Sequence, residues 1–452
     1  MRIKKRTLTT TRIIMLGFFI GAMLGTVCLM LPISIREGSS LDFSDALFVS
    51  VSAICVTGLS TVNVGQTFSA FGQVILLLLI QFGGLGIVTF TTLLLLVLRR
   101  RITLSERILL QNAYNLDTLS GLVRLTVKIF KATLLIEGIG AVGYSLVFVP
   151  EYGLRGIWYG IFHAVSAFCN AGIDLLGKES FCAYADNVII NITTILLIIA
   201  GGLGFPVYWE IIRASGGHRT KAEGGYVRKL NIHARIVLVM TVLLITVGTV
   251  LTLVFEYDNP DTLGNMSWGN KLLAAAFQSV TLRTAGFATI NQSLFRNASC
   301  LVYIIIMFIG GSPAGTAGGV KTVTVALLSA SLMANIRGRK DVTIMHRRIA
   351  DEYIRRCVAI VFFSFSALMV LTTALLFVQD GDFLDILYEM TSAIATVGLS
   401  RGITVELNFA GRMIVALAMY LGRIGPITLA LAFNSSRSAS DVSYADSRVI
   451  IG

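Results

Sequence analysis

Charged side chains are scarce in this sequence. Asp, Glu, Lys and Arg make up only 14% of its 452 residues, whereas 55% are hydrophobic. A soluble protein of this length needs more charge to cover its surface, so that class is excluded. Uncharged runs long enough for a membrane span of roughly 20 residues occur at 74–98, 188–209, 236–255, 298–320 and 357–379. The sequence therefore predicts an all-α, multi-pass protein of the cell membrane.

Cysteine is also sparse, and its six copies are scattered at positions 28, 55, 169, 182, 300 and 357. No CxxC pair or metal-ligand spacing occurs, which argues against a disulfide framework and against a zinc site. The sequence likewise lacks a Ser/His/Asp arrangement and a paired-carboxylate dyad. We therefore predict no tightly bound cofactor and no resident metal, and a membrane-embedded enzyme is the least favoured class.

The net charge of +12 is concentrated in alternate segments between the apolar runs. Arg and Lys cluster at 2–12, 99–107, 213–235 and 337–356. The positive-inside rule assigns these clusters and both termini to the cytoplasm. The basic residues lie in short loops beside spans rather than on one folded module, so nucleic-acid binding is not predicted. The first apolar stretch is too long for a signal peptide and is predicted to be an uncleaved span.

Eight long apolar segments are predicted to be membrane spans, at about 13–35, 72–98, 126–149, 188–211, 236–256, 299–333, 357–379 and 411–433. A shorter apolar piece lies inside each consecutive pair, at 43–54, 157–168, 272–282 and 383–394. About a dozen residues are too few to cross a bilayer, and this length is typical of a re-entrant segment. The pattern predicts four tandem repeats of span, re-entrant loop and span at 1–100, 101–215, 216–340 and 341–433, then a cytoplasmic tail at 434–452.

Each short piece ends in a similar glycine-containing stretch, and we number these stretches glycine segments 1 to 4. Their glycines, Gly58, Gly172, Gly286 and Gly398, recur at intervals of 114, 114 and 112 residues. Because every repeat has two spans, all four repeats share one orientation, which requires an axis along the membrane normal. The four re-entrant pieces are therefore expected to converge on a pseudo-fourfold pore.

Backbone that leaves a helix inside a membrane has to be buried or line a watery cavity. Its carbonyl oxygens can replace the hydration shell of a permeating cation, and glycine reaches the backbone angles that this requires. Close helix packing is the alternative role of a single glycine, but four at matching positions favour a pore. The predicted ion-binding residues are Val56, Thr57, Gly58, Asn170, Ala171, Gly172, Thr284, Ala285, Gly286, Thr396, Val397 and Gly398.

The four-repeat layout closely resembles the Trk/Ktr/HKT superfamily of potassium transporters, and the motifs that carry this resemblance are Thr57-Gly58, Asn170-Ala-Gly172, Arg283-Thr-Ala-Gly-Phe287 and Thr396-Val-Gly398. The eight-span length is most similar to KtrB, the membrane subunit of bacterial Ktr systems. The resemblance covers about residues 31–452 and implies channel-like conduction of K⁺. In that family, glycine in all four segments goes with K⁺ preference. K⁺ is thus the expected transported ion, and Na⁺ is a candidate activator that the sequence leaves open.

The sixth predicted span contains a run that cannot stay helical. Residues 310–319 include five glycines and a proline, and each Gly costs about 1 kcal/mol and Pro about 3 kcal/mol relative to Ala. A nucleotide-binding GxxxxGK[ST] loop is not predicted, because Val320 precedes Lys321 where that motif needs Gly. The run resembles the family's intramembrane gating loop, which assigns a gating role to Gly310, Gly311, Ser312, Pro313, Ala314, Gly315, Thr316, Ala317, Gly318 and Gly319.

Arg423 lies in the last predicted span, where a charge is costly and usually faces an interior or an aqueous path. Snorkelling to the interface is the alternative. The residue matches the family's pore arginine. The resemblance implies that it forms an electrostatic barrier and contacts the gating loop. For Arg283, Glu137 and His163 structural bracing is favoured, and a proton relay through Glu137 or His163 stays open.

The resemblance also implies partners. It predicts a homodimer embedded in membrane lipid, with one pore in each protomer, resting on a cytosolic ring of nucleotide-binding regulatory subunits similar to KtrA or KtrC. Two other functions remain open. One is a secondary carrier in which K⁺ entry is coupled to Na⁺ or H⁺. The other is a Na⁺-selective member of the family, which Gly58 disfavours.

Overall fold

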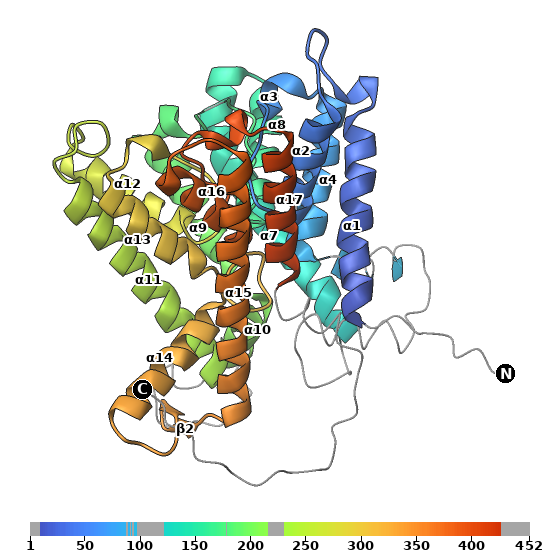
Figure 1. Cartoon of the computed structure of the whole chain (residues 1–452). Coiled ribbons are helices and arrows are strands. Elements are labelled where there is room, and N and C mark those ends of the chain that lie inside the picture. The colour runs from blue at the N-terminus through green and yellow to red at the C-terminus, as the bar shows by residue number, and fades with distance from the viewer. Residues whose placement is uncertain are drawn as a thin grey trace.

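The computed structural model describes residues 10–86, 89–90, 92, 95–96, 122–177, 179–215 and 230–425. These residues form a predominantly helical protein with several apolar helices, which confirms the expected class (Figure 1). The predicted tail at 434–452 and the basic cluster at 99–101 lie outside the described residues. One short hairpin of β1 (Thr343–Ile344) and β2 (Arg347–Arg348) interrupts the all-helical expectation between two helices.

Four long helices are long and apolar enough to cross a membrane. They are α1 (Thr10–Leu29), α7 (Leu122–Tyr152), α11 (Ile232–Glu256) and α15 (Asp351–Val378). The first is shorter than predicted, because Pro32 begins a separate 3₁₀ turn, η1 (Pro32–Ser34). Proline lacks the N–H that a continuing helix needs. The other three extend a few residues beyond the predicted starts at 126, 236 and 357.

Four short helices follow the long ones and stay inside the protein. They are α2 (Phe43–Cys55), α8 (Arg155–Phe168), α12 (Trp268–Thr281) and α16 (Phe383–Ala395). Thirteen or fourteen residues reach only about 20 Å at 1.5 Å per residue, which is less than a bilayer core. Most of their side chains are buried, and α2 lies against α1, α4 and α17. The bounds agree closely with the predicted short apolar pieces.

The helices that follow the four short helices do not continue as the sequence suggested. The predicted span at 188–211 is wrong as a single helix, because α9 (Val188–Gly202) and α10 (Phe205–Ser215) meet at 92°. Gly86 caps the C-terminus of α4 (Ala70–Leu85), and Gly425 caps that of α17 (Phe409–Ile424). Positive φ angles of 83°, 87° and 86° at Gly86, Gly204 and Gly425 turn the chain out of the helix. The sixth predicted span divides into α13 (Asn297–Phe308) and α14 (Thr322–Ile336).

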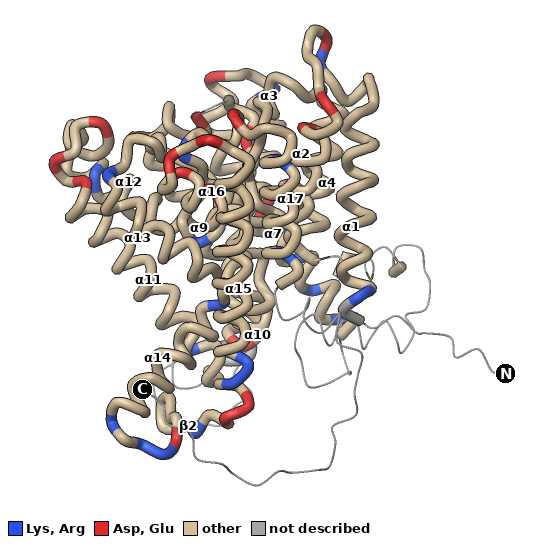
Figure 2. Tube along the Cα trace, viewed as in Figure 1, with Lys and Arg blue, Asp and Glu red and all other residues tan. Residues whose placement is uncertain are grey.

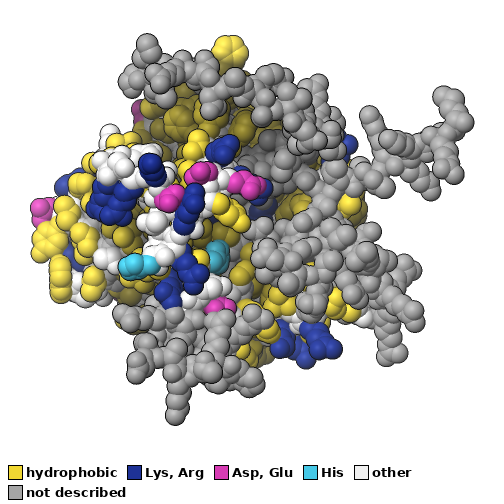
Figure 3. Space-filling model, turned by 90° about the horizontal axis from the view of Figure 1, so that it is seen from below, with side chains coloured by type: hydrophobic (Ala, Val, Ile, Leu, Met, Phe, Trp, Pro, Cys, Tyr) yellow, Lys and Arg dark blue, Asp and Glu magenta, His cyan; other side chains and the backbone are white. Residues whose placement is uncertain are grey.

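Short elements connect these helices at the upper end of Figure 1. They are α3 (Val64–Thr67), η2 (Cys182–Tyr184), η4 (Gln292–Leu294) and η5 (Ile403–Glu406). Acidic and basic residues lie mainly at the two ends of the molecule, and few occur in the stretch between them (Figure 2). Lys and Arg gather at the lower end near α10, α14 and β2, and the view from below shows them on that face (Figure 3).

An ion pair joins α17, near the end of the described chain, to α2, near its beginning. Arg412 Nη1 on α17 lies 2.8 Å from Asp45 Oδ1 on α2 and 2.9 Å from Ser44 Oγ. The two charged side chains are only 20% and 12% exposed, and Asp45 also accepts a bond from Thr61. Because removing one member strands the other in a poorly solvated place, this pair should contribute to stability.

We expect Arg412→Ala to lower the unfolding free energy by about 1–3 kcal/mol, since the Asp45 carboxylate loses its charged partner. Thermal unfolding in detergent measures the effect. Arg356→Ala is the control, because the Arg356–Glu352 pair is 65% and 70% exposed, and exposed pairs contribute less than about 1 kcal/mol. Equal unfolding midpoints for the two variants would contradict a stabilising role for the Arg412–Asp45 pair.

Candidate functional site: a ring of main-chain carbonyl groups

The four glycine segments meet in the centre of the protein. A methyl group placed on Gly58 would lie 2.6 Å from the Ala171 carbonyl oxygen, 3.2 Å from Gly398 Cα and 3.3 Å from Gly172 Cα. On Gly286 it would lie 2.9 Å from Gly172 Cα and 3.3 Å from Gly398 Cα. The structure thus brings together four residues that are more than one hundred positions apart in sequence.

Each glycine faces a carbonyl oxygen of the next segment, and the four contacts close into a ring. The carbonyl always belongs to the residue just before the next glycine. Methyl groups on Gly58, Gly172, Gly286 and Gly398 would lie 2.6, 2.6, 2.8 and 2.1 Å from the carbonyl oxygens of Ala171, Ala285, Val397 and Thr57, respectively. Real Cβ atoms do not approach oxygen this closely. A side chain at any of the four positions would therefore displace part of the ring.

The backbone of the segments is held in an uncommon conformation. Each segment has one non-glycine residue with positive φ, namely 57° at Val56, 59° at Asn170, 75° at Thr284 and 51° at Thr396. Such angles are outliers for β-branched residues and persist only where the surroundings enforce them. Glycine two residues later is also left-handed in every segment. The sequence offered no signal for Val56 or the two threonines, whose residue types normally avoid this region.

Several polar atoms at the ring are buried without a hydrogen-bond partner among the described residues. They are Oγ1 of Thr57, Thr284 and Thr396, and both amide atoms of Asn170. Each glycine segment contributes one such side chain. Buried polar groups normally find partners, since leaving them unpaired costs free energy. A site with this much uncompensated polarity is suited to a cation or to water.

An outer cavity opens on the side of the residues that follow the glycines. Its volume is about 440 Å³, and all four ring glycines line it. The charged residues of its lining are Asp174 and Glu179. Asp174 accepts hydrogen bonds from the Leu176 and Gly177 N–H groups, and burial raises the pKa of its carboxyl to about 6. The two carboxyl groups place acidic side chains at the mouth of the cavity.

On the other side of the ring lies the irregular stretch between α13 and α14. A methyl group on Gly318 would lie 2.0 Å from Thr396 Oγ1 and 2.7 Å from the Ala395 carbonyl oxygen, so this loop contacts glycine segment 4. The predicted gating residues Gly310 to Gly319 all fall in it. Its ends are joined by a hydrogen bond of 3.0 Å from Val320 N–H to the Phe308 carbonyl.

The break between α9 and α10 holds the same loop. Ser312 and Thr316 donate their N–H groups to the carbonyls of Gly202 and Gly201, at 3.1 and 3.2 Å. In return, Phe205 N–H donates to the Ala314 carbonyl at 3.0 Å. A continuous helix would have used these groups for its own hydrogen bonds. The bend at Gly204 is therefore stabilised by hydrogen bonds to the loop. Sequence periodicity does not predict such a contact between distant segments.

Two positively charged side chains donate hydrogen bonds to main-chain carbonyls of the loop. Arg423 donates to the carbonyls of Thr316 and Gly83, and more weakly to Gly84 at 3.5 Å. Lys321 Nζ donates to the Ala317 carbonyl at 2.7 Å and to Gly318 at 3.4 Å. Neither side chain has a carboxylate partner among the described residues. Arg423 was predicted to be functional from its place in an apolar segment, whereas the contacts of Lys321 are evident only in the fold.

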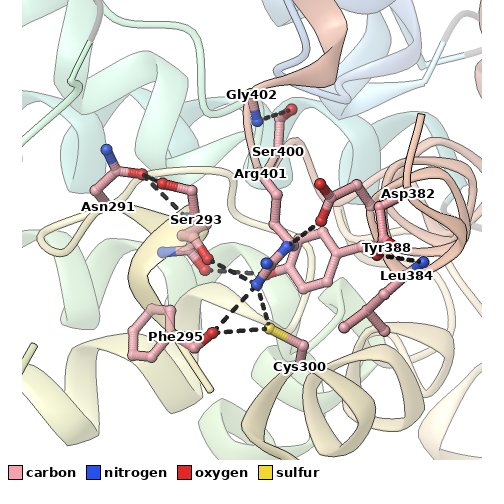
Figure 4. A network of polar contacts seen from close by, with 12 residues as sticks. Asn291, Ser293, Phe295, Cys300, Asp382, Leu384, Tyr388, Ser400, Arg401 and Gly402 are labelled. Carbon is pink, nitrogen blue, oxygen red and sulfur yellow. Dashed lines mark hydrogen bonds and ion pairs between the residues drawn. The ribbon is translucent and has the colours of Figure 1, made fainter. Parts of the chain in front are cut away.

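Arg401 is a residue that the sequence did not single out. It lies three positions after Gly398 and points into a cluster of acceptors (Figure 4). Its Nε pairs with Asp385 at 2.5 Å, and its Nη1 reaches Cys300 Sγ at 2.6 Å and the Gln292 and Phe295 carbonyls at 3.3 Å. Arg401 thereby ties the chain after glycine segment 4 to the third unit, beside the cavity mouth.

The three other polar residues that the sequence singled out each have a local hydrogen-bond partner. Both ring nitrogens of His163 are occupied, one by the Tyr159 carbonyl at 2.6 Å and one by Leu175 N–H at 3.4 Å. Glu137 accepts from Gln81 Nε2 at 3.3 Å and lies 3.9 Å from Cys169 Sγ. Arg283 reaches Thr241 Oγ1 at 3.5 Å, and its Nε has no partner among the described residues. None of the three lines the outer cavity.

Comparisons with known proteins agree on one family. A family model described as TrkH, a cation transport protein, matches residues 6–442. The chain is 37% identical to the potassium/sodium uptake protein NtpJ of Enterococcus hirae, over 100% of this chain and 99% of that protein. It is 36% identical to the Ktr system potassium uptake protein B of Bacillus subtilis (strain 168), over 98% and 97%.

A solved structure has the same fold. The crystal structure of the potassium transporter TrkH from Vibrio parahaemolyticus matches this chain with a TM-score of 0.75. The match covers 96% of this chain and 87% of the other at 18% sequence identity. At that identity the likeness establishes the fold alone.

We expect Gly318→Ala to destabilise the protein by about 1–3 kcal/mol, because the added methyl collides with Thr396 and the Ala395 carbonyl. Gly138→Ala is the matched control. Gly138 lies in α7 with open space around its Cα, so alanine there should be neutral or stabilising by up to about 1 kcal/mol. Thermal unfolding in detergent compares them. Indistinguishable midpoints would show that the loop does not pack against glycine segment 4.

Proposed function

The chain belongs to the TrkH family of cation transport proteins, and from this premise we propose that it is the potassium-translocating membrane subunit of a bacterial K⁺ uptake system. As a family member with apolar helices, it is a membrane protein, and its family is one of transporters rather than enzymes. In this proposal the four units form eight membrane crossings around one pore, with the four re-entrant helices meeting at its axis.

The closed ring of Gly58, Gly172, Gly286 and Gly398 carries the proposal. A K⁺ ion that enters a narrow filter has to exchange its water shell for other oxygens, and main-chain carbonyls supply them. Left-handed residues alternate along each segment, and in this conformation successive carbonyl groups can point to the same side of the chain. The unpartnered side-chain oxygens of Thr57, Thr284 and Thr396 support an ion or water beside the ring.

Helix electrostatics act in the same direction. α2, α8, α12 and α16 all end within a few residues of the ring glycines, so four C-terminal ends point toward it. Each C-terminus carries about half a negative charge, which stabilises a cation. The acidic mouth at Asp174 and Glu179 adds to this field. An anion would meet repulsion from every one of these sources.

The loop at 310–319 and Arg423 form the proposed gate. They lie across the glycine ring from the outer cavity, and Arg423 bridges the loop to α4. A fixed positive charge in that position opposes the passage of K⁺ until the loop moves. The hydrogen bonds to Gly201 and Gly202 hold the loop in the described position.

The proposed partners follow from the relatives. The relative from Bacillus subtilis is named as part of a Ktr system, and we propose that this chain likewise works with a cytosolic nucleotide-binding regulatory ring and as a homodimer. Basic residues at the lower end support a cytoplasmic position for that end, and we propose the same side for both termini on the positive-inside rule. No nucleotide site is assigned to this chain itself.

Two alternatives deserve separate measurements. A relative at 37% identity is named a potassium/sodium uptake protein, so Na⁺ passage is the first. Coupled carriage of K⁺ with Na⁺ or H⁺ is the second. Current that reverses at the K⁺ equilibrium potential regardless of Na⁺ and H⁺ gradients favours uncoupled K⁺ conduction. A reversal potential that follows either other gradient favours the corresponding alternative.

Gly58→Ser should raise Na⁺ passage and reduce K⁺ preference, because its Cβ would lie 2.6 Å from the Ala171 carbonyl oxygen and distort the ring. K⁺ and Na⁺ uptake in a K⁺-uptake-deficient bacterium measures the change. Gly38→Ser is the control, since Gly38 has a similarly positive φ of 82° but open space around it. A Gly58→Ser protein that retains wild-type selectivity would remove the ring from the mechanism.

Arg423→Ala should leave the protein folded and increase the rate of K⁺ passage, because it removes both a positive barrier and a link between the loop and α4. Arg423→Lys should lie between wild type and Arg423→Ala, since lysine keeps the charge but not the forked geometry. Flux into proteoliposomes separates the three. Unchanged kinetics in Arg423→Ala would exclude the residue from gating.

A further inference from the structure

One hydroxyl group behind each glycine segment contacts that segment. Ser52, Ser166, Thr281 and Ser392 lie in the last turns of α2, α8, α12 and α16, and all four are fully buried. Their main-chain carbonyls accept the N–H of the residue before each ring glycine, at 2.8–3.0 Å. Their side chains make a second contact with the same segment, and this contact differs between the units.

In segments 1 and 4 the hydroxyl accepts a hydrogen bond from the ring glycine itself. Gly58 N–H donates to Ser52 Oγ at 3.0 Å, and Gly398 N–H donates to Ser392 Oγ at 3.0 Å. The bond fixes the peptide unit before each of these glycines. The carbonyls of Leu59 and Leu399, one residue further on, receive no hydrogen bond from the described residues. Both leucines line the outer cavity.

In segments 2 and 3 the hydroxyl donates instead of accepting. Ser166 Oγ–H bonds to the Ile173 carbonyl at 2.7 Å, and Thr281 Oγ1–H bonds to the Phe287 carbonyl at 2.6 Å. These carbonyls belong to the residues just after the ring glycines, at the level of Leu59 and Leu399. A carbonyl bonded to a hydroxyl behind its segment cannot also turn its oxygen to the centre.

The sequence shows the same division into two types. Segments 1 and 4 continue as Gly58-Leu-Ser60 and Gly398-Leu-Ser400, whereas segments 2 and 3 both contain Ala-Gly, at 171–172 and 285–286. The residues around the glycines therefore divide the segments into the same two pairs as the hydrogen bonds do. Segments 1 and 4 are neighbours in the closed ring, and so are segments 2 and 3.

We infer that the four hydroxyls are positioning residues that determine ion selectivity by setting which carbonyls face the proposed pore, an inference that rests on the proposed function. The level just outside the glycine ring then offers an incoming monovalent cation only two main-chain oxygens, those of Leu59 and Leu399. The outermost ion site of the proposed pore therefore has main-chain ligands from glycine segments 1 and 4 only, whereas the glycine ring has carbonyls from all four segments.

Releasing the tied carbonyls tests one half of the inference. Ser166→Ala and Thr281→Val free the oxygens of Ile173 and Phe287, so the outer level gains ligands and the half-saturating K⁺ concentration falls. The expected change is about fivefold for each variant, the factor that corresponds to one ordinary hydrogen bond. K⁺ flux into proteoliposomes against external K⁺ concentration measures it.

Releasing the glycine N–H groups tests the other half. Ser52→Ala and Ser392→Ala let the peptide units of segments 1 and 4 rotate, so the K⁺ over Na⁺ permeability ratio falls, again by about fivefold. Reversal potentials under bi-ionic conditions report this ratio and do not depend on the amount of active protein. A general loss of stability would reduce flux without shifting that ratio.

Matched controls lie on the same helices. Ser50 and Ser279 are buried two residues before Ser52 and Thr281, but their hydroxyls bond to the carbonyls of Ala22 and Ile245 on neighbouring helices. Ser50→Ala and Ser279→Ala should keep the wild-type ratio and half-saturation. Where an alanine variant yields no folded protein, Ser52→Cys, Ser166→Cys or Ser392→Cys weakens the same bond at similar volume and should shift the same quantity.

Wild-type half-saturation and permeability ratio in all the hydroxyl variants would overturn the inference while leaving K⁺ conduction intact. Equal shifts in the Ser50 and Ser279 controls would also overturn it, because the effect would then belong to helix packing. A wild-type protein that passes no K⁺ under any condition instead refutes the proposed function. The two failures are therefore distinguishable.

Discussion

Main-chain polar groups that leave a helix inside a membrane need a partner, and this requirement shapes the protein. Breaks occur at four short helices and again where α4, α9, α13 and α17 end. Several carbonyls at and near the second set of breaks receive hydrogen bonds within the protein. Gly83 receives Arg423, Gly201 and Gly202 receive the loop N–H groups, and Gly318 receives Lys321 and Gly311 N–H. The carbonyls of the glycine ring receive no hydrogen bond from the described residues, and in the proposed function they are the ligands of a cation.

Arg423 and Lys321 bind main-chain carbonyls, the same kind of group that forms the glycine ring. Arg423 and Lys321 hold main-chain oxygens as a bound ion would, and neither pairs with a carboxylate among the described residues. In the proposed gate, these two side chains hold the loop in place through its main-chain oxygens.

Much of the arrangement could be predicted from residue patterns. The short helices fall where apolar runs are too short to cross a bilayer, and the four glycines were identified by the similar stretches that contain them and by their regular spacing. The bend at Gly204 was missed because Gly201-Gly202 reads equally well as a close packing contact within one helix. The positive φ at Val56 and Thr396 was unpredictable because β-branched residues disfavour it and only the surrounding contacts enforce it. Arg401 looked like an ordinary surface charge until the fold placed Asp385 beside it.

The sequence by itself determined the membrane class, the repeated glycines and the loop that cannot be helical, because hydropathy, spacing and backbone propensity are local properties. Only the tertiary structure decided which atoms those glycines face. Whether a hydroxyl accepts from an N–H, as at Ser52, or donates to a carbonyl, as at Ser166, depends on how two segments approach each other in space. A hydrogen bond is set by distances of a few tenths of an ångström, and no pattern along the chain records them.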